Sequence, residues 1–136
     1  MNFKILEDNL AKSFINDSES FENMRDLLYF TEWFDENNVK LYLLYEDDII
    51  KSFALLSKME KDPLRKHLNP YHLNYIYTFE NERRKGYAYN LSLEIKKEHV
   101  TVFCMNEETI NLFKKAEYNF ESLDTLYKTI PIYRYP

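Results

Sequence analysis

The chain of 136 residues has a single glycine, Gly86, in the segment FENERRKGYAYNL that spans Phe79 to Leu91. Globular chains carry glycine at about 7% of positions, so this sequence has lost nearly all of its glycines and kept one. We therefore expect Gly86 to occupy a position where a side chain would be in the way. The residues around it should show what approaches the backbone there.

The length and composition favour one globular domain over residues 1–136. Hydrophobic residues make up 45% of the chain and aromatic residues 17%, which is enough apolar surface for a single core. The one cysteine, Cys104, excludes a disulfide framework and a cysteine-rich zinc site, so no metal is expected. The N-terminal residues lack the apolar core of a signal peptide, and we expect a cytoplasmic protein.

Charge is distributed unevenly along the chain, whose formal net charge is −5. Residues 1–50 carry 12 acidic and 4 basic side chains, whereas residues 51–100 carry 6 acidic and 10 basic ones. A net acidic chain without a basic stripe is a poor nucleic-acid binder, because phosphate neutralisation supplies most of that affinity. No apolar run is long enough to span a membrane, so neither nucleic acid nor membrane is an expected partner.

Hydrophobic periodicity predicts eleven elements in the order β-α-α-β-β-β-α-β-α-β-β. Strands are expected in the segments MNFKIL, VKLYLLYE, IIKSFALLSKM, YHLNYIYTF and HVTVFCM, and in a closing pair within NFESLDTLYKTIPIY. Apolar residues at helical spacings predict an amphipathic helix that begins after Ser20 and ends near Asn37. Further helices are expected from Gly86 to about Lys97 and over NEETINLFKKAEY, and Asp47-Asp48 reads as a hairpin turn. The fold class is α/β (α+β).

Gly86 thus lies where a strand gives way to a helix. The first N–H groups of a helix lack partners and carry partial positive charge, so such a turn suits an anion. Arg83, Arg84 and Lys85 precede the glycine and add donors for phosphate oxygens. Two interpretations remain open: a phosphate-binding turn, or a close contact of helix and strand beside a solvated basic face.

The segment Arg83-Arg84-Lys85-Gly86-Tyr87-Ala88 resembles the (Arg/Gln)-x-x-Gly-x-(Gly/Ala) pyrophosphate loop of the GNAT superfamily of acetyl-CoA-dependent N-acetyltransferases. LNYIYTFENE before it is similar to that family's fourth strand, and CMNEETINLFKKAEYNF after it is similar to the fifth strand and fourth helix. The resemblance covers about Tyr71 to Phe120. It implies a GNAT-like fold, with a central, mixed and mostly antiparallel sheet of about six or seven strands flanked by about four helices.

The resemblance also implies a role for each block in binding acetyl-CoA as a co-substrate. Main-chain N–H groups of residues 84–88, with the basic side chains beside them, would hold the pyrophosphate. Tyr77 and Thr78 would pair with the pantetheine arm, and an N–H near Ile76 or Tyr77 would stabilise the oxyanion. The cofactor-binding residues implied are Ile76, Tyr77, Thr78, Arg83, Arg84, Lys85, Gly86, Tyr87, Ala88 and Asn106. Asn106 could instead serve only as the N-cap of its helix.

The resemblance also suggests catalytic residues. The family's base on the fourth strand maps to about His72, and histidine has a pKa suited to the task, although such a histidine can also be purely structural. Glu80 and Glu82 are weaker alternatives because they lie in the cofactor loop. The tyrosine that commonly protonates the thiolate falls on Phe113, so Tyr118 or Tyr127 would have to replace it, or the thiolate leaves unaided. The family's Gly-Phe pair is Glu117-Tyr118 here, and we expect that turn to be shifted.

The implied activity is transfer of an acetyl group from acetyl-CoA to a primary amine by direct attack in a ternary complex. The acidic helix residues Glu19, Glu22, Asp26, Glu32, Asp35 and Glu36 favour a cationic acceptor, namely a protein lysine or N-terminus, a polyamine or an aminoglycoside. They could equally be an ordinary solvated helix face. The expected partners are acyl-CoA and a small or protein amine, with a monomer or homodimer as the assembly. The alternatives are an inactive acyl-CoA-binding sensor and an interaction domain without a ligand.

Overall fold

A computed structural model describes residues 1–29, 31–59, 70–79, 85–123 and 130–134 of the chain. The seven strands are β1 (Asn2–Glu7), β2 (Val39–Glu46), β3 (Ile49–Lys58), β4 (Tyr71–Thr78), β5 (Thr101–Phe103), β6 (Asn119–Leu123) and β7 (Pro131–Arg134). The α-helices are α1 (Asp8–Asp17), α2 (Arg25–Tyr29), α3 (Tyr87–Glu94) and α4 (Glu107–Lys115). Short 3-10 segments are η1 (Glu19–Met24), η2 (Glu32–Asp35) and η4 (Ile95–Glu98). The expected order of strands and helices is confirmed.

The strands form one sheet in the order β1-β2-β3-β4-β5-β7-β6. All neighbours are antiparallel except β4 and β5, which are parallel. The turn between β2 and β3 is Asp47-Asp48, and both residues adopt positive φ, 55° and 62°. Two such residues give a hairpin turn whose twist matches the strands, so the chain closes this hairpin without glycine.

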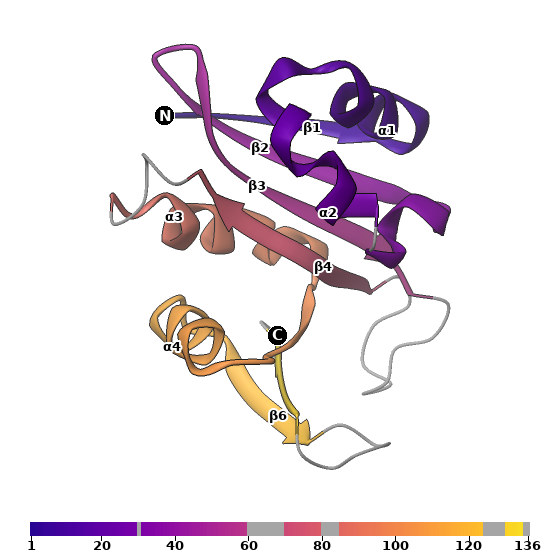
Figure 1. The fold of residues 1–136 in the computed structure, drawn as a ribbon. Helices are drawn as coiled ribbons and strands as arrows, with labels where there is room; N and C mark the ends of the chain where they lie inside the picture. Colours follow the sequence, from indigo (N-terminus) through magenta and orange to yellow (C-terminus); the bar gives the residue numbers. More distant parts are fainter. Residues whose placement is uncertain (30, 60–69, 80–84, 124–129, 135–136) are drawn as a thin grey trace.

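The sheet separates two hydrophobic clusters. Helices α1 and α2 cover the face that is nearer the viewer in Figure 1, whereas α3 lies behind the sheet. The cluster on the α1/α2 face contains Phe21, Leu28, Trp33 and Phe53, and the cluster on the α3/α4 face contains Tyr42, Leu91 and Phe113. Each face is therefore closed by its own helices, and consecutive strand residues alternate between the two clusters.

The prediction of one continuous helix before β2 is wrong. The segment is broken into η1, α2 and η2. Phe21, Met24 and Leu28 are buried as expected, whereas Phe34 is half-buried and its neighbour Trp33 is fully buried. Phe21 and Met24 lie three residues apart, which suits the three-residue turn of a 3-10 helix. Leu28 and Trp33 lie five residues apart, and one uninterrupted α-helix could not bury both on the same line. A bend after α2 solves this, and the N–H of Thr31 donates to the carbonyl of Leu28 there at 3.0 Å.

Candidate functional site

Strands β4 and β5 pair at their start and then diverge. His72 of β4 pairs with Thr101 of β5, although β4 continues to Thr78 and β5 to Phe103. Beyond Phe103, the chain bonds to the last strand: the N–H of Cys104 donates to the Pro131 carbonyl at 2.9 Å. We call this divergence the β4–β5 fork. Because the strands separate, the inner edge of β4 beyond His72 faces this fork.

Hydrogen bonds along β4 show which main-chain groups face the fork. The carbonyl of Tyr77 accepts a bond from Ser52 Oγ at 2.7 Å, and the N–H of Phe79 donates to the Lys51 carbonyl at 3.1 Å. Residues 77 and 79 therefore direct their main chain toward β3. In an antiparallel ladder the direction alternates, so the main-chain groups of Ile76 and Thr78 face the fork. Of the two oxyanion donors considered for this strand, Ile76 is the better placed.

A β-bulge at Asn74 changes the face that β4 presents. Leu55 pairs with Tyr75 and Leu56 pairs with Leu73, so Asn74 has no partner residue on β3. Its Oδ1 accepts a hydrogen bond from Ser57 Oγ at 2.8 Å. A bulge places two consecutive side chains on the same side of a strand. An asparagine inside a strand, where it is disfavoured, was the available sequence signal, and our sequence analysis drew no bulge from it.

His72 lies at the base of the fork. Its side chain is half-buried, and its ring meets that of Phe103 edge-on, with centroids 5.2 Å apart. Burial lowers the pKa of His72, and the negative charge of Glu32 in η2 opposes that shift. The neutral imidazole, the form that can accept a proton, is thereby favoured near neutral pH.

Gly86 is the N-cap residue of α3 and lies in the left-handed region, with φ 80° and ψ 10°. Its carbonyl accepts bonds from the N–H of Asn90 at 3.0 Å and from Asn90 Nδ2 at 2.8 Å. A Cβ added at Gly86 would meet only Asn90 Nδ2, at an ordinary 3.7 Å. The described protein atoms therefore leave room for a side chain, and within the protein only the left-handed conformation favours glycine here.

The rest of the basic turn is only partly described. Arg83 and Arg84, together with Glu80 and Glu82, lie outside the described residues. Lys85 is exposed, and Ala88 is half-buried in the first turn of α3. Tyr87 is buried and its hydroxyl donates to the carboxylate of Glu46. That bond fastens the start of α3 to the end of β2.

Asn106 is the N-cap of α4. Its Oδ1 accepts from the N–H of Thr109 at 2.8 Å and from Thr109 Oγ1 at 2.8 Å. The capping interpretation is thus satisfied by the protein alone, and a contact between Asn106 and the cofactor stays a prediction. Neither of these two hydrogen bonds involves Asn106 Nδ2.

Tyr118 is buried in the hydrophobic cluster of the α3/α4 face. Its hydroxyl donates to the Ser92 carbonyl at 2.7 Å, and its ring packs on Phe113 with centroids 4.8 Å apart. Burial raises the pKa of this phenol well above its ordinary value. Its role as the acid stays a prediction, and the bond to Ser92 weighs against it. Tyr127 lies outside the described residues.

The turn at Glu117 is not shifted, contrary to expectation. Glu117 adopts φ 66°. The N–H of Glu117 donates to the Lys114 carbonyl at 3.0 Å, and the N–H of Tyr118 donates to the Phe113 carbonyl at 2.9 Å. These two bonds and the Phe113–Tyr118 contact form a Schellman motif. A glutamate therefore takes the conformation that glycine usually takes at a helix end.

Cys104 is buried, and burial raises the pKa of its thiol to about 11. A thiol of that pKa is almost wholly protonated at neutral pH. Cys104 therefore behaves as a small buried apolar residue.

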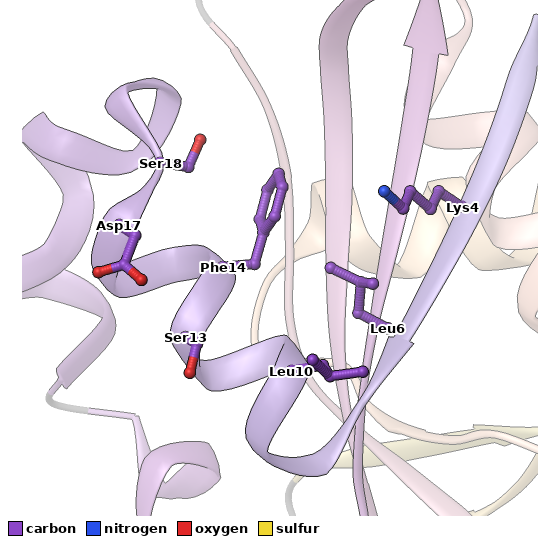
Figure 2. Close-up of a pocket in the computed structure, with 7 residues that line it drawn as sticks. All are labelled: Lys4, Leu6, Leu10, Ser13, Phe14, Asp17 and Ser18. Atoms are coloured by element: carbon purple, nitrogen blue, oxygen red, sulfur yellow. The ribbon is translucent and has the colours of Figure 1, made fainter.

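A separate hollow of about 470 Å³ lies between β1 and α1. Figure 2 shows the Phe14 ring between the Lys4 ammonium and the Asp17 carboxylate, with Leu6 and Leu10 nearby. Strands β2 and β3 separate β1 from β4 in the sheet, so this hollow is apart from the fork. In the described part of the chain, no helix is long and apolar enough to cross a membrane, and no group of three or more acidic, histidine or cysteine side chains could hold a metal.

No protein-family model matches the chain, and no curated protein matches it by sequence. Solved structures do match over nearly the whole length. NAA60 of Arabidopsis thaliana in complex with acetyl-CoA is 13% identical, with a TM-score of 0.64 over 98% of this chain and 99% of that one. A protein of Desulfovibrio desulfuricans described as belonging to the GNAT acetyltransferase family is 13% identical, with a TM-score of 0.57 over 98% of both chains.

A third neighbour is the KacTA–DNA complex, at 13% identity and a TM-score of 0.62 over 98% of this chain and 93% of that one. At such identities the likeness concerns the fold alone. The chain therefore has the fold of the GNAT acetyltransferases, with a seven-stranded mixed sheet and four α-helices among the described residues.

Proposed function

We propose that this protein transfers an acetyl group from acetyl-CoA to a primary amine by direct attack. The observation that carries the proposal is the β4–β5 fork, which opens beside the Gly86 turn at the start of α3 in a GNAT fold. The solved neighbour NAA60 has acetyl-CoA bound. In this chain, the first N–H groups of α3 would receive the pyrophosphate, with Lys85, Arg83 and Arg84 as cationic donors.

The thioester would lie along the inner edge of β4. The Ile76 N–H faces the fork and would donate to the oxygen that becomes negative in the tetrahedral intermediate. Thr78 would pair with the pantetheine arm through its main chain. Main-chain donors held by a strand need no rearrangement as the charge develops, which is the property that this step requires.

The acceptor must lose a proton before it attacks. An amine of lysine type has a pKa of about 10.4, so only a very small fraction is neutral at pH 7. His72 lies at the base of the fork in a setting that favours its neutral form. We assign it the role of base, which takes the proton from the ammonium so that the nitrogen lone pair can attack the carbonyl carbon.

The departing thiolate is the conjugate base of a thiol with a pKa of about 8.5. It therefore needs little help from an acid to leave. Phe113 occupies the family's usual acid position, and the Tyr118 hydroxyl is already bonded to Ser92. This one feature favours the second candidate function, an acyl-CoA-binding protein without turnover. Turnover by the wild type separates the two functions. Where turnover is found, Tyr118→Phe tests the acid, because loss of the acid would slow turnover while leaving acetyl-CoA binding unchanged.

The first experiment measures acetyl-CoA binding by calorimetry for the wild type, Gly86→Glu and Gly86→Asn. Asparagine accepts the left-handed conformation and adds no charge, so Gly86→Asn is the matched control. We expect the wild type to bind, Gly86→Asn to bind more weakly because its side chain crowds the phosphates, and Gly86→Glu to lose at least tenfold in affinity relative to Gly86→Asn, since its carboxylate would face the phosphates. If a well-folded wild type fails to bind, the cofactor assignment is wrong.

Thiol release with spermidine, kanamycin and a lysine peptide then identifies the acceptor class. Release that depends on one of them establishes the transferase, and binding without release supports the sensor. The net charge of −5 speaks against DNA as a partner, but one structural neighbour is a DNA complex. Fluorescence anisotropy with a short DNA duplex, in which we expect no binding at physiological salt, is therefore part of the same series.

A further inference from the structure

A buried hydroxyl of β3 lies beside the end of β4. Ser52 is fully buried, and residues 53–56, which follow it in the strand, are all apolar. Its register partner is Thr78, the last residue of β4. Ala54 belongs to the hydrophobic cluster of the α3/α4 face, and Ser52, which alternates in step with it, points to the same face. The hydroxyl thus lies on the side of the sheet that α3 and α4 cover.

The Ser52 hydroxyl contacts both of the last residues of β4. Its Oγ donates to the Tyr77 carbonyl at 2.7 Å and lies 3.1 Å from Thr78 Oγ1. A hydroxyl has one proton and two acceptor lone pairs. Because the Ser52 proton is used on the Tyr77 carbonyl, Thr78 Oγ1 is the donor in the second contact. Ser52 therefore satisfies its buried hydroxyl entirely at one end of β4.

The bond to Tyr77 fixes the peptide group that joins Tyr77 to Thr78. In a trans peptide, the carbonyl of one residue and the N–H of the next lie in one plane and point in opposite directions. The Tyr77 carbonyl points toward β3, where Ser52 holds it, so the Thr78 N–H points into the β4–β5 fork. A carbonyl that accepts a hydrogen bond also polarises its peptide group, which makes the Thr78 N–H a stronger donor.

The end of β4 is fastened from the β3 side. On the other side, β4 pairs with β5 at His72, and the two strands then diverge. Beyond the Ser52 contacts, the Phe79 N–H donates to the Lys51 carbonyl at 3.1 Å. A ligand that enters the fork would therefore meet a main-chain donor whose direction is set by β3.

We propose that Ser52 is a positioning residue for the binding of acyl-CoA. Its hydroxyl holds the Tyr77–Thr78 peptide so that the Thr78 N–H donates to a carbonyl oxygen of the pantetheine arm. A donor that is already oriented loses little freedom when the ligand binds, so its hydrogen bond contributes more to affinity. The inference rests on the proposed function, because it places the arm in the fork.

The first test observes the bond in the protein without a ligand. Ser52→Ala removes the hydroxyl, and Ser52→Thr keeps one. Ser57→Ala is the matched control, because Ser57 is another buried serine of β3 whose Oγ donates to β4, at Asn74. We expect the carbonyl ¹³C signal of Tyr77 in NMR spectra to shift in Ser52→Ala and to stay in place in Ser57→Ala. An unchanged Tyr77 signal in Ser52→Ala overturns the inference.

The second test is calorimetry with acetyl-CoA, CoA and adenosine 3′,5′-bisphosphate, the nucleotide part of CoA without the pantetheine arm. Weakening one hydrogen bond to the arm should lower the affinity of Ser52→Ala for acetyl-CoA and CoA by roughly threefold to tenfold. Ser52→Thr should restore most of that affinity, and Ser57→Ala should bind like the wild type. The bisphosphate should bind Ser52→Ala and the wild type equally, whereas a general loss of structure would weaken all three ligands.

Thr78→Val shows whether the main chain or the side chain of Thr78 contacts the arm. It removes the hydroxyl and keeps the N–H, so we expect the affinity of the wild type for CoA. A loss as large as that of Ser52→Ala would overturn the assignment to the N–H, and so would a loss confined to acetyl-CoA, which has the thioester that CoA lacks. If the wild type binds CoA and Ser52→Ala binds it equally well, the inference is wrong and the proposed function stands. A well-folded wild type that binds neither CoA nor acetyl-CoA overturns the proposed function and with it the role of Ser52, whatever the Tyr77 signal shows.

Discussion

At the scale of single residues, the chain places side chains in backbone conformations that usually call for glycine. Within the described part of the chain, six residues other than glycine have positive φ: Asp8, Asn38, Asp47, Asp48, His99 and Glu117. Asn and Asp tolerate this region because their short polar side chains bond locally. Glu117 has no such advantage, so its turn carries strain that the Schellman bonds and the Phe113–Tyr118 contact offset.

Replacing Glu117 with glycine should therefore stabilise the protein. A left-handed conformation costs a residue with Cβ roughly 1–2 kcal/mol, and glycine removes that cost while losing some unfolded-state entropy. We expect a net gain of about 1 kcal/mol in the free energy of unfolding, measured by urea denaturation. Glu108→Gly, inside α4, is the control and should lose about 1 kcal/mol. Equal effects of the two changes would contradict the strain argument.

Gly86 differs from Glu117 in what it offers a ligand. Both have positive φ, yet the chain kept glycine only at the turn where our proposal places the pyrophosphate. The described protein atoms around Gly86 would tolerate a Cβ, so the conformation alone does not account for the difference. A phosphate lying against the backbone would account for it.

At the scale of elements, the cap of α4 separates two roles of Asn106. Asn106→Ala removes the bonds to Thr109 and should cost about 1 kcal/mol of stability. Asn106→Ser keeps a capping oxygen and should recover most of that loss. If Asn106 only caps the helix, Asn106→Ser binds acetyl-CoA like the wild type. A tenfold weaker affinity with unchanged stability would instead show that the amide contacts the cofactor.

The elements were predictable from sequence to the extent that their hydrophobic patterns were regular. VKLYLLYE is a short, nearly continuous run of apolar and aromatic residues, which is typical of a strand buried on both faces, and β2 has the expected bounds, Val39–Glu46. The segment from Ser20 to Asn37 has irregular spacings, and there the tertiary packing of Trp33 and Leu28 broke the helix into pieces. The conformation of the turn at Glu117 was also predicted wrongly, because nothing in the sequence shows that this glutamate adopts a positive φ.

The candidate site was predictable where a motif marks a backbone turn, and less so where side-chain chemistry depends on three-dimensional neighbours. Gly86 is found where a strand-to-helix junction was expected. The bulge at Asn74 depends on a register slip between β3 and β4. An asparagine inside a strand is a weak signal for such a slip, and its position depends on how β3 and β4 pack.

At the scale of the whole molecule, the two faces of the sheet would have different roles in the proposed reaction. The α3/α4 face carries the Gly86 turn and would hold the cofactor, whereas the α1/α2 face carries His72, Glu32 and the acidic third of the chain. The fork between β4 and β5 is where the two sides meet. An acceptor that enters over α2 would reach the thioester without passing the pyrophosphate, as a ternary complex requires.

The α3/α4 face also determines how the fold responds to alkali. Tyr42 donates to Glu98 Oε2 at 2.8 Å and Tyr118 donates to Ser92, and burial raises the pKa of both phenols above the ordinary value. A raised folded-state pKa means that the unfolded chain loses its proton first, near pH 10. The stability that these groups contribute is therefore present below about pH 10 and is lost as the pH rises further.

We expect the free energy of unfolding to fall above pH 10 by up to about 1.4 kcal/mol per pH unit for each of the two tyrosines. Urea denaturation at pH 9, 10 and 11 measures the slope. Tyr118→Phe should start from a lower stability, because the bond to Ser92 is gone, but should show a shallower decline. Tyr29→Phe, at an exposed position, is the control and should keep the wild-type slope. If Tyr118→Phe declines as steeply as the wild type, the buried phenol does not bring about the alkaline loss, and the packing assigned to this face would need another explanation.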